Sequence, residues 1–206
     1  LATPDAEIMQ FGKDFGIETV LTSDKHERAT ERAEEALQIY KKQGEEYDYV
    51  LLLQGDEPQI DPEEIDNLAL ALKNSSNCVV NIIHPIEGED MTNSSVVKSI
   101  LDSHGNILFF SRAHIPNKSN SGYRQLGMIG FTAKILEKYC ELEPTTLEIT
   151  ESIDMMRFLE NDIEISSLMT HKSIIGVDHP EDIKKVELLM ANDVLVEEYS
   201  NLFIKK

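Results

Sequence analysis

The stretch that decides the fold of this chain reads Val50-Leu51-Leu52-Leu53-Gln54-Gly55-Asp56-Glu57-Pro58. Four consecutive apolar residues are typical of a strand that is buried on both faces of a parallel sheet. Gly55 interrupts the strand and Pro58 fixes the backbone beyond it, because glycine is conformationally permissive and proline locks φ. The stretch therefore predicts a central strand that ends in two carboxylates, Asp56 and Glu57.

Two interpretations of these acids remain open. Open α/β sheets bind ligands at the carboxyl ends of their strands, where two carboxylates suit a divalent metal and a polyphosphate. Alternatively, the acids lie in a surface turn or cap the helix that begins near Asp61. The pattern by itself favours neither interpretation.

The composition restricts the class of protein. With 206 residues, the chain fits one large α/β domain, and we assign residues 1–206 to it. The net charge of −19 argues against a nucleic-acid partner, because phosphate backbones are bound by clustered cations, whereas a single nucleotide remains compatible. No apolar stretch approaches the ~20 residues of a membrane span. We therefore expect a cytoplasmic protein with no membrane span.

Helices and strands alternate in the first half of the chain. Amphipathic spacing and helix-end signals predict helices at residues 4–15, 27–43 and 62–73. Apolar runs predict strands at residues 17–21, 50–53 and 78–83. This order predicts an α/β fold with a mostly parallel sheet and right-handed crossovers.

The rhythm of the sequence changes in the second half. Strand candidates at residues 95–101 and 107–111 are joined by a glycine-containing turn, and a third covers residues 124–132. We interpret residues 95–132 as an inserted antiparallel lobe for substrate and dimer contacts. The remaining predictions are helices at 133–140 and 147–161, a strand at 163–169, and a helix from Pro180.

A second acidic residue, Asp178, follows a short apolar run that predicts a strand and precedes a predicted helix start. Two aspartates at one sheet edge would bind a hard cation such as Mg²⁺ and leave positions open for phosphate and water. The alternative is that Asp178 only caps the helix that starts at Pro180. The segment by itself favours the cap.

Two further regions carry candidate binding residues. The segment His26-Glu27-Arg28-Ala29-Thr30 lies at a loop-to-helix junction, where backbone amides suit a nucleotide, although a charged helix face explains it as well. Arg112 follows a strand and suits a carboxylate such as that of an acidic sugar, with an ordinary ion pair as the alternative. Glu148 and Glu151 lie one helical turn apart, where they would bind a polyol or remain solvated.

Several of these segments, in this order, carry a family resemblance. They are Gln54-Gly55-Asp56-Glu57-Pro58, Val96-Val97-Lys98 with Asp102 and Gly105, Phe110-Ser111-Arg112-Ala113 with Ile115-Pro116, Leu147-Glu148 with Glu151-Ser152, Val177-Asp178-His179-Pro180-Glu181-Asp182, and His26 with Thr30-Glu31-Arg32. Together they span almost the whole chain and resemble the 3-deoxy-manno-octulosonate cytidylyltransferases, the CMP-Kdo synthetases. Each motif is weak alone, but their common order is specific.

The resemblance implies a fold and a reaction. The implied fold is a three-layer α/β sheet, mostly parallel, like that of nucleotide-diphospho-sugar transferases, with an inserted antiparallel lobe and a homodimeric assembly. The implied reaction joins CTP to an eight-carbon acidic sugar, Kdo or a modified Kdo, giving CMP-sugar and pyrophosphate for lipopolysaccharide synthesis. Mg²⁺ is the implied cofactor, and a 3-deoxy-ulosonic acid is the implied partner of CTP.

The resemblance also assigns site residues. The catalytic and metal-binding aspartates would be Asp56 and Asp178. The substrate-binding residues would be Gln54, Arg112, Gln125 and Glu148, and the nucleotide-binding residues His26, Arg28, Ala29 and Thr30. Some positions depart from the family pattern: Arg28-Ala29 replaces Ser-Gly, Gln125 replaces His, Ile129 replaces Tyr, and Ile149 replaces Gln. The changes in the sugar pocket favour a modified Kdo or another ulosonic acid.

Two rival hypotheses remain, and the opening of the sequence motivates the first of them. The family begins with a strand and a loop that grips the triphosphate, and we expect this sequence, which opens at Leu1, to start beyond that loop. One rival is therefore a catalytically incomplete fragment that acts as a structural or dimerisation partner. The other, a glycosyltransferase with a nucleotide-sugar donor, ranks last because such enzymes usually carry Asp-x-Asp where this chain has Gly55-Asp56-Glu57.

Overall fold

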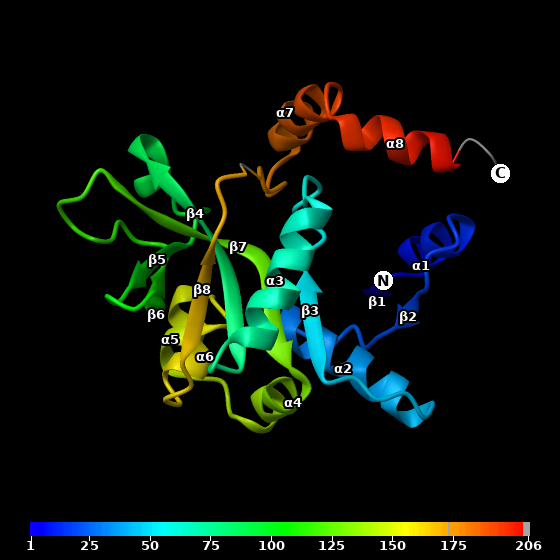
Figure 1. The fold of residues 1–206 in the computed structure, drawn as a ribbon, viewed down its shortest axis with the longest axis horizontal. Helices are drawn as coiled ribbons and strands as arrows, with labels where there is room; N and C mark the ends of the chain where they lie inside the picture. The colour runs from blue at the N-terminus through cyan, green and yellow to red at the C-terminus, as the bar shows by residue number, and fades with distance from the viewer. Residues whose placement is uncertain (173, 204–206) are drawn as a thin grey trace.

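The main element of the protein is a six-stranded sheet with the strand order β3-β7-β4-β8-β6-β5 (Figure 1). The computed structural model describes the backbone of residues 1–172 and 174–203, and the side chains of residues 1–172 and 174–199. The strands are β3 (Tyr49–Leu53), β4 (Val79–Glu87), β5 (Lys98–Leu101), β6 (Asn106–Ser111), β7 (Ser121–Thr132) and β8 (Ile165–Met169).

Strand β3 is the strand predicted from the decisive stretch, but its surroundings differ from the prediction. It pairs with β7 in antiparallel orientation along its whole length, from Tyr49 opposite Thr132 to Leu53 opposite Met128. It lies at the end of the strand order, and its residues are partly exposed. The prediction of a central, doubly buried strand is therefore wrong, because β7 returns between β3 and β4 and occupies the position of a parallel neighbour.

The sheet is mixed rather than mostly parallel in its pairings. Strands β4 and β8 pair in parallel, while the other described pairings of this sheet are antiparallel. Strands β3, β4 and β8 still run in one direction, since β3 and β4 are both antiparallel to β7. The strands of residues 95–132 are antiparallel as predicted, but they are hydrogen bonded into the main sheet, and a separate lobe is not confirmed.

A small second sheet precedes the main one. It pairs β1 (Ala2–Thr3) with β2 (Val20–Leu21) in parallel, and α1 (Ala6–Asp14) connects them. Helix α1 begins at Asp5, whose side chain accepts hydrogen bonds from the amides of Glu7 and Ile8, as an N-cap should. The predicted strand at residues 17–21 and the helix at residues 4–15 are thus present, both with shorter bounds.

Helices cover the two faces of the main sheet and give three layers (Figure 1). Helix α3 (Pro62–Asn74) covers one face, and the other face is covered by α2 (Ala29–Lys42), α4 (Ala133–Glu141), α5 (Thr146–Glu151) and α6 (Met156–Leu159). Strand β4 serves both cores: Val79 and Ile83 pack with the α2 side, and Val80 and Ile82 with α3. Successive residues of a strand point to opposite faces, which explains why this apolar run fills two cores.

The helix predicted at residues 147–161 is two helices. Ser152 adopts the left-handed conformation, with φ of 55°, and ends α5 before α6 begins. The remaining elements are a short 3-10 helix η1 (Gly88–Met91), α7 (Pro180–Met190) and α8 (Val194–Phe203). Pro180 stands in the first turn of α7, as predicted. Among the described residues, no helix is both long and apolar enough to cross a membrane.

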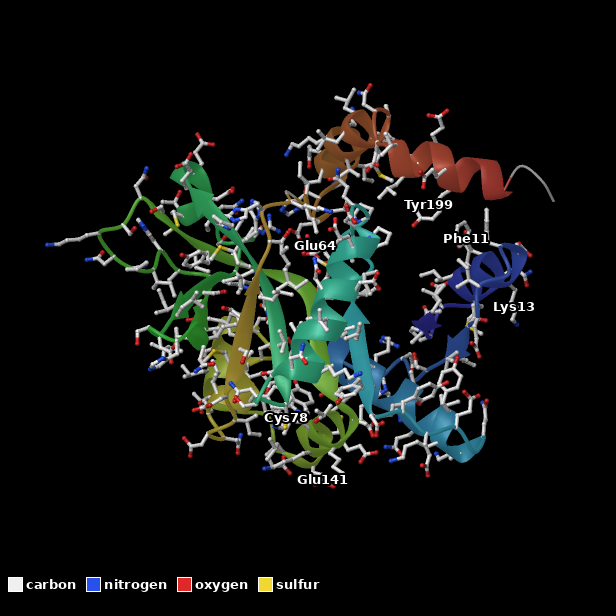
Figure 2. All side chains as sticks on the ribbon, viewed as in Figure 1. Phe11, Lys13, Glu64, Cys78, Glu141 and Tyr199 are labelled. Atoms are coloured by element: carbon white, nitrogen blue, oxygen red, sulfur yellow. The ribbon has the colours of Figure 1, made fainter. Side chains whose placement is uncertain are left out.

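Several apolar and thiol side chains lie on the surface (Figure 2). Phe11 of α1 and Tyr199 of α8 are large exposed side chains. Cys78 and Cys140 are exposed, and neither forms a disulfide in the described part of the chain. Cys78 directly precedes β4, so the apolar run of that strand does not extend to it.

The packing of Phe158 in the core predicts that its substitution strongly lowers the stability of the fold. Phe158 of α6 is fully buried, with its ring centroid 5.1 Å from that of Tyr139 and 6.0 Å from that of Phe131. We expect Phe158→Ala to lower the free energy of unfolding by about 3–5 kcal/mol, because it leaves a cavity. Urea denaturation measures this value. The control Leu108→Ala, at an exposed position of β6, should change stability by less than about 0.5 kcal/mol; equal losses would contradict the assigned core.

Candidate functional site

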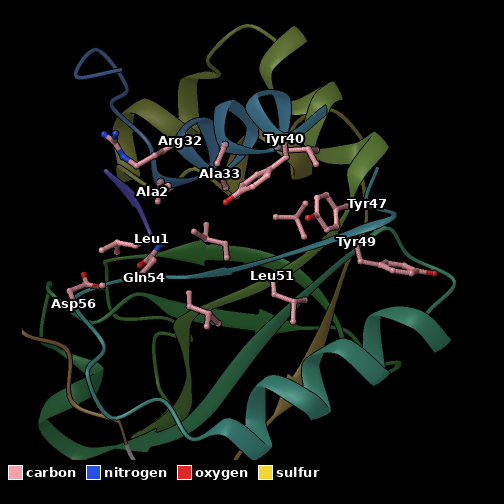
Figure 3. Close-up of a pocket in the computed structure, with 17 residues that line it drawn as sticks. Leu1, Ala2, Arg32, Ala33, Tyr40, Tyr47, Tyr49, Leu51, Gln54 and Asp56 are labelled. Atoms are coloured by element: carbon pink, nitrogen blue, oxygen red, sulfur yellow. The ribbon is translucent and has the colours of Figure 1, made fainter. Parts of the chain in front are cut away.

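A groove of about 950 Å³ lies between strand β3 and helix α2 (Figure 3). Helix α2 contributes three alanines together with Arg32, Leu37 and Tyr40, and Leu1 and Ala2 also line the groove. Strand β3 lines it along its whole length, and the lining continues through the turn that carries Gln54 and Asp56. The groove therefore brings together three predicted site residues, Ala29, Gln54 and Asp56.

The turn after β3 is anchored by Glu57, while Asp56 is exposed. One carboxylate oxygen of Glu57, Oε1, accepts a hydrogen bond of 2.8 Å from the amide of Gly127 on β7. Burial raises the pKa of Glu57, and the charges of Asp56 and Asp178 act in the same direction, against the Gly127 bond and the cation of Arg124. Glu57 thus fixes the turn and leaves Asp56 toward solvent.

The segment before α7 returns to this turn. The amide of Val177 donates a hydrogen bond of 2.8 Å to the carbonyl of Asp56. Asp178 is the next residue after Val177, so this bond brings the backbone of the exposed Asp178 close to that of Asp56. The N-cap of α7 is His179, and that of α3 is Asp61. The interpretations of Asp56 and Asp178 as helix caps are therefore wrong, because other residues hold those positions.

The two aspartates have the chemistry that Mg²⁺ requires. Carboxylates on adjoining turns suit a small hard cation that keeps several positions for phosphate and water. In residues 1–172 and 174–199, no group of three or more His, Cys, Asp or Glu side chains could hold a metal ion. A cation at this turn would therefore take further oxygen ligands from its substrate and solvent.

Two predicted substrate residues, Gln54 and Gln125, contact the middle of the sheet. The amide of Gln54 donates to the carbonyl of Gly127, and a Cβ at Gly127 would lie only 2.8 Å from the Cβ of Gln54. Position 127 therefore requires glycine. The Gln125 side chain donates a bond of 2.6 Å to the side-chain oxygen of the buried Asn81, whose nitrogen in turn donates to carbonyls of β7.

Arg112 is held in place by hydrogen bonds to Glu151 of helix α5. The backbone amide of Arg112 donates to the Glu151 carboxylate at 3.0 Å, and its Nε donates to the Glu151 carbonyl at 3.1 Å. The Nζ of Lys98 donates to the carbonyl of Arg112 at 2.6 Å, and burial, together with the nearby Arg112 charge, lowers the pKa of Lys98. In the described chain the guanidinium of Arg112 bonds carbonyl oxygens, including those of Ser94 and Ser95, which leaves its charge suited to an incoming carboxylate.

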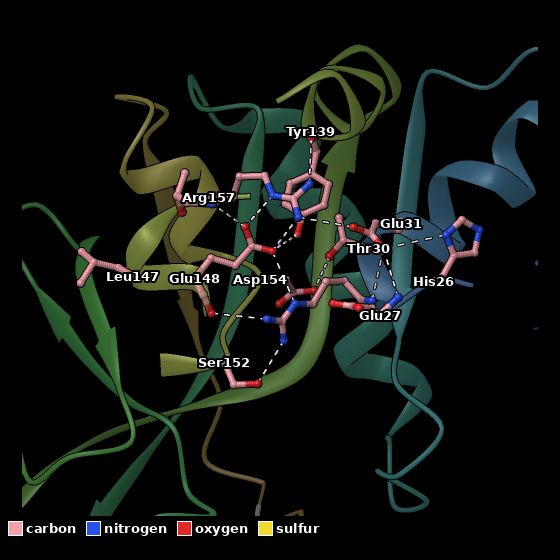
Figure 4. A network of polar contacts seen from close by, with 12 residues as sticks. His26, Glu27, Thr30, Glu31, Tyr139, Leu147, Glu148, Ser152, Asp154 and Arg157 are labelled. Atoms are coloured by element: carbon pink, nitrogen blue, oxygen red, sulfur yellow. Dashed lines mark hydrogen bonds and ion pairs between the residues drawn. The ribbon is translucent and has the colours of Figure 1, made fainter. Parts of the chain in front are cut away.

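Glu148 lies inside a network of buried polar groups rather than at a surface (Figure 4). Its side chain is 1% exposed, and its two oxygens each accept a bond of 2.6 Å from Arg157. Arg157 also lies 4.0 Å over the ring of Tyr139 and reaches Glu31 at 3.3 Å. Burial alone would raise the pKa of Glu148, but the hydrogen bonds and charge of Arg157 hold it below its ordinary value. A sugar hydroxyl would have to displace these partners.

Several of the predicted nucleotide-binding residues at the start of α2 form hydrogen bonds and ion pairs with this network. The guanidinium of Arg28 points onto α5, with its Nε 3.4 Å from a Glu148 oxygen. Thr30 is fully buried and donates a bond of 2.6 Å to Asp154. The His26 ring nitrogen Nε2 lies 2.6 Å from a carboxylate oxygen of Glu35. Of the four residues predicted to bind the nucleotide, Ala29 is the one that lines the groove.

The structure shows two important residues that sequence reasoning missed. Arg157 pairs with Glu148, and its one available signal was a lone charge inside the apolar run Met155-Met156-Arg157-Phe158, which indicates a buried partner. Burial raises the pKa of Glu57 and the charge of Arg124 opposes that rise, but the motif around Arg124 pointed only to its neighbour Gln125. The substrate, nucleotide and metal roles assigned from the sequence stay predictions.

The buried pair of Glu148 and Arg157 makes a pH-dependent prediction. Arg157→Met removes both short bonds to the buried Glu148 carboxylate and leaves Arg28, at 3.4 Å, as its nearest described cation, so we expect a loss of about 3 kcal/mol in unfolding free energy at pH 7. Folding lowers the pKa of Glu148 below its ordinary value of 4.5. The charged carboxylate therefore stabilises the folded protein at pH values above 4.5, and this contribution is lost as the pH falls through the lowered pKa. The difference between wild type and variant should therefore shrink as the pH falls through that range.

Urea titrations at pH 7 and pH 4 measure both parts of this prediction. Lys41→Met provides the control, because Lys41 pairs with Glu137 at a partly exposed position of α2. We expect it to cost less than about 1 kcal/mol at either pH. A penalty for Arg157→Met that stays constant with pH would contradict the role assigned to Glu148.

Comparisons with known proteins agree with the motifs. The family model described as Cytidylyltransferase matches residues 1–165. A 3-deoxy-manno-octulosonate cytidylyltransferase of Parabacteroides distasonis is 32% identical over 93% of this chain and 81% of its own length. The protein of the same name from Thermodesulfovibrio yellowstonii is 35% identical over 91% of this chain and 79% of its own length.

Solved structures give the same result. A CMP:2-keto-3-deoxy-manno-octonic acid synthetase complexed with CTP is similar with a TM-score of 0.82 and 28% identity, covering 91% of this chain and 78% of that one. A putative glucose-1-phosphate thymidylyltransferase of Bacillus anthracis shares the fold alone, with a TM-score of 0.62 and 13% identity. The resemblance inferred from the motifs is thus confirmed: the chain belongs to the cytidylyltransferases, in the family of the 3-deoxy-manno-octulosonate cytidylyltransferases.

Proposed function

We propose that this chain transfers CMP from CTP to an eight-carbon 3-deoxy-ulosonic acid, Kdo or a modified Kdo, for lipopolysaccharide synthesis. The observation that carries the proposal is the groove along β3, whose lining includes Ala29 at one wall and Asp56 at its end. Asp178 follows the segment that is hydrogen bonded to Asp56. A nucleotide in the groove would thus have its phosphates directed toward two exposed aspartates.

The reaction is a displacement at phosphorus. The anomeric oxygen of the sugar forms a bond to the α-phosphate of CTP, the bond from that phosphate to the β-phosphate oxygen breaks, and the hydroxyl proton leaves to solvent. Asp56 and Asp178 would hold Mg²⁺, which supplies charge neutralisation at the phosphates when bound. The groove, with Ala29 of α2 in its wall, would orient the nucleotide, so that the displacement starts from an aligned pair of reactants.

The sugar would be recognised mainly through its carboxylate. Arg112 presents a guanidinium that bonds carbonyl oxygens in the described chain, and such a group binds a carboxylate strongly. Gln54 and Gln125 offer amide groups near the same sheet, which suit sugar hydroxyls. For Glu148 we propose a supporting role behind the sugar, because Arg157 and Arg28 occupy its oxygens.

We further propose a homodimer in the cytoplasm, with subunit contacts from residues 95–132. The family resemblance of the motifs in that region supports this assembly. The alternative function, a catalytically incomplete structural or dimerisation partner, gains no support from the comparisons. Sedimentation measurements on the purified chain test the assembly, and a monomer at working concentration would contradict it.

Asp56→Ala tests the metal and catalytic assignment. We expect pyrophosphate release from CTP and Kdo with Mg²⁺ to fall by more than about 10²-fold, because the charge on the phosphates is no longer offset. The exposed side chain makes little cavity, so stability should change by less than about 1 kcal/mol. Asp66→Ala, at an exposed position of α3, is the matched control and should keep wild-type activity.

Each outcome of this assay separates the hypotheses. An active Asp56→Ala protein would show that the metal assignment is wrong. Release by the wild type and the control alone would support the proposal. No release by any of the three proteins, with Kdo or with an 8-amino analogue, would favour the catalytically incomplete alternative.

Asp178→Asn tests the second carboxylate through the metal requirement. Removing one negative ligand should raise the Mg²⁺ concentration needed for half-maximal activity by at least about tenfold. A magnesium titration of the initial rate measures this shift. Glu181→Gln, an exposed neighbour in the first turn of α7, is the control. An unchanged titration for Asp178→Asn would remove Asp178 from the metal site.

A further inference from the structure

Arg28 reaches from the N-cap of α2 onto the end of helix α5, more than one hundred residues away in sequence. Its Nη1 donates a hydrogen bond of 3.1 Å to the hydroxyl of Ser152, and its Nη2 donates one of 3.4 Å to the carbonyl of Glu148. Its Nε lies 3.4 Å from a carboxylate oxygen of Glu148. All three nitrogens of the guanidinium therefore face α5 or its C-cap.

The contact with Ser152 falls on a strained turn. Ser152 has φ of 55° and ψ of 49°, a left-handed conformation that side chains other than glycine rarely adopt. The amide of Ser152 closes the helix on the Glu148 carbonyl, the same oxygen that accepts from Arg28. Arg28 therefore bonds both groups that define the end of α5, the Ser152 hydroxyl and the Glu148 carbonyl.

The residue directly before this turn, Glu151, holds Arg112. The hydroxyl of Ser111 donates to both carboxylate oxygens of Glu151 at 3.0 Å, and the Arg112 amide donates to one of them. The Arg112 guanidinium bonds the Glu151 carbonyl. A rotation of the turn at Ser152 would thus displace both the backbone and the guanidinium of Arg112.

We propose that Arg28 is a positioning residue for the sugar-carboxylate site, acting through Ser152 and Glu151 on Arg112. This inference rests on the proposed function, in which Arg112 receives the carboxylate of the sugar. The neighbour of Arg28 in the chain, Ala29, lines the groove that we assign to the nucleotide. Arg28 would therefore hold the proposed sugar-carboxylate site in place, although it belongs to the segment that lines the proposed nucleotide groove.

Steady-state kinetics distinguish positioning from general support of the fold. Arg28→Ala should raise the KM for Kdo by about 10- to 100-fold, the effect of a small displacement of a binding group. The KM for CTP should change less than about twofold, since Ala29 and the groove remain. The KM of Arg28→Lys for Kdo should lie between those of the wild type and Arg28→Ala, because an ammonium group can replace one contact of the guanidinium but not its planar, two-pronged geometry.

Two further variants isolate the contact between Arg28 and Ser152. Ser152→Ala removes the hydroxyl that Arg28 bonds and keeps the guanidinium, so it should raise the KM for Kdo in the same selective way. Lys41→Ala breaks a different link of α2, the ion pair with Glu137, and should leave both KM values unchanged. If Arg28 only supports the fold, the thermal midpoint and kcat fall while the KM for Kdo does not rise selectively; that result would overturn the proposal.

Hydrogen exchange provides a readout that needs no activity. The Arg112 amide is protected by Glu151, so Arg28→Ala and Ser152→Ala should speed its exchange at least about tenfold, with no such change in Lys41→Ala. If the wild type releases no pyrophosphate, the proposed function fails, but exchange still decides whether Arg28 holds Arg112. Unchanged exchange at Arg112 in both variants would overturn the inference, whatever the kinetics show.

Discussion

The structure depends on the position of β7 between β3 and β4. This strand is hydrogen bonded to both neighbours in antiparallel orientation and so joins the two apolar strands into one sheet. Its alternating side chains fill both cores, with Ile129 on the α2 side and Met128 on the α3 side. At Gly127 the strand lacks a side chain, and there Gln54 packs and Glu57 is anchored. The turn that carries Asp56 is consequently built on β7.

Burial of charge shapes the other side of the site. Removing a charge from water is costly unless a partner with good geometry compensates, and Glu148 with Arg157 meets that condition through two short bonds. The network extends to Arg28 and Glu31 at the start of α2, so it links α2 to α5 and α6. This arrangement explains why Glu148, which the sequence predicts to bind the substrate, is buried against Arg157. It also gives Arg28, a departure from the family pattern, a defined set of contacts.

The groove owes its form to the edge position of β3. No described strand pairs with the outer side of β3, and Leu1 and Ala2 line the groove together with α2 and β3. An unpaired strand edge offers backbone donors and acceptors, and the alanines of α2 leave room beside β3. The groove thus combines an apolar wall with polar backbone and ends at the carboxylate of Asp56. This combination suits a ligand with an aromatic base and a charged phosphate group.

The sequence by itself determined the features whose causes are local. The helix starts at Asp61 and Pro180 depend on a cap and a fixed φ angle of a few residues, and the order of motifs was enough to identify the family. Only the tertiary structure decided which strands are neighbours, where α5 ends, and which charges are buried. Those outcomes depend on residues far apart in the chain, such as Glu57 with Gly127 and Arg28 with Ser152, which no short window contains. Hydrogen bonding and desolvation act across space, so spacing along the chain could name the carboxylates but not their partners.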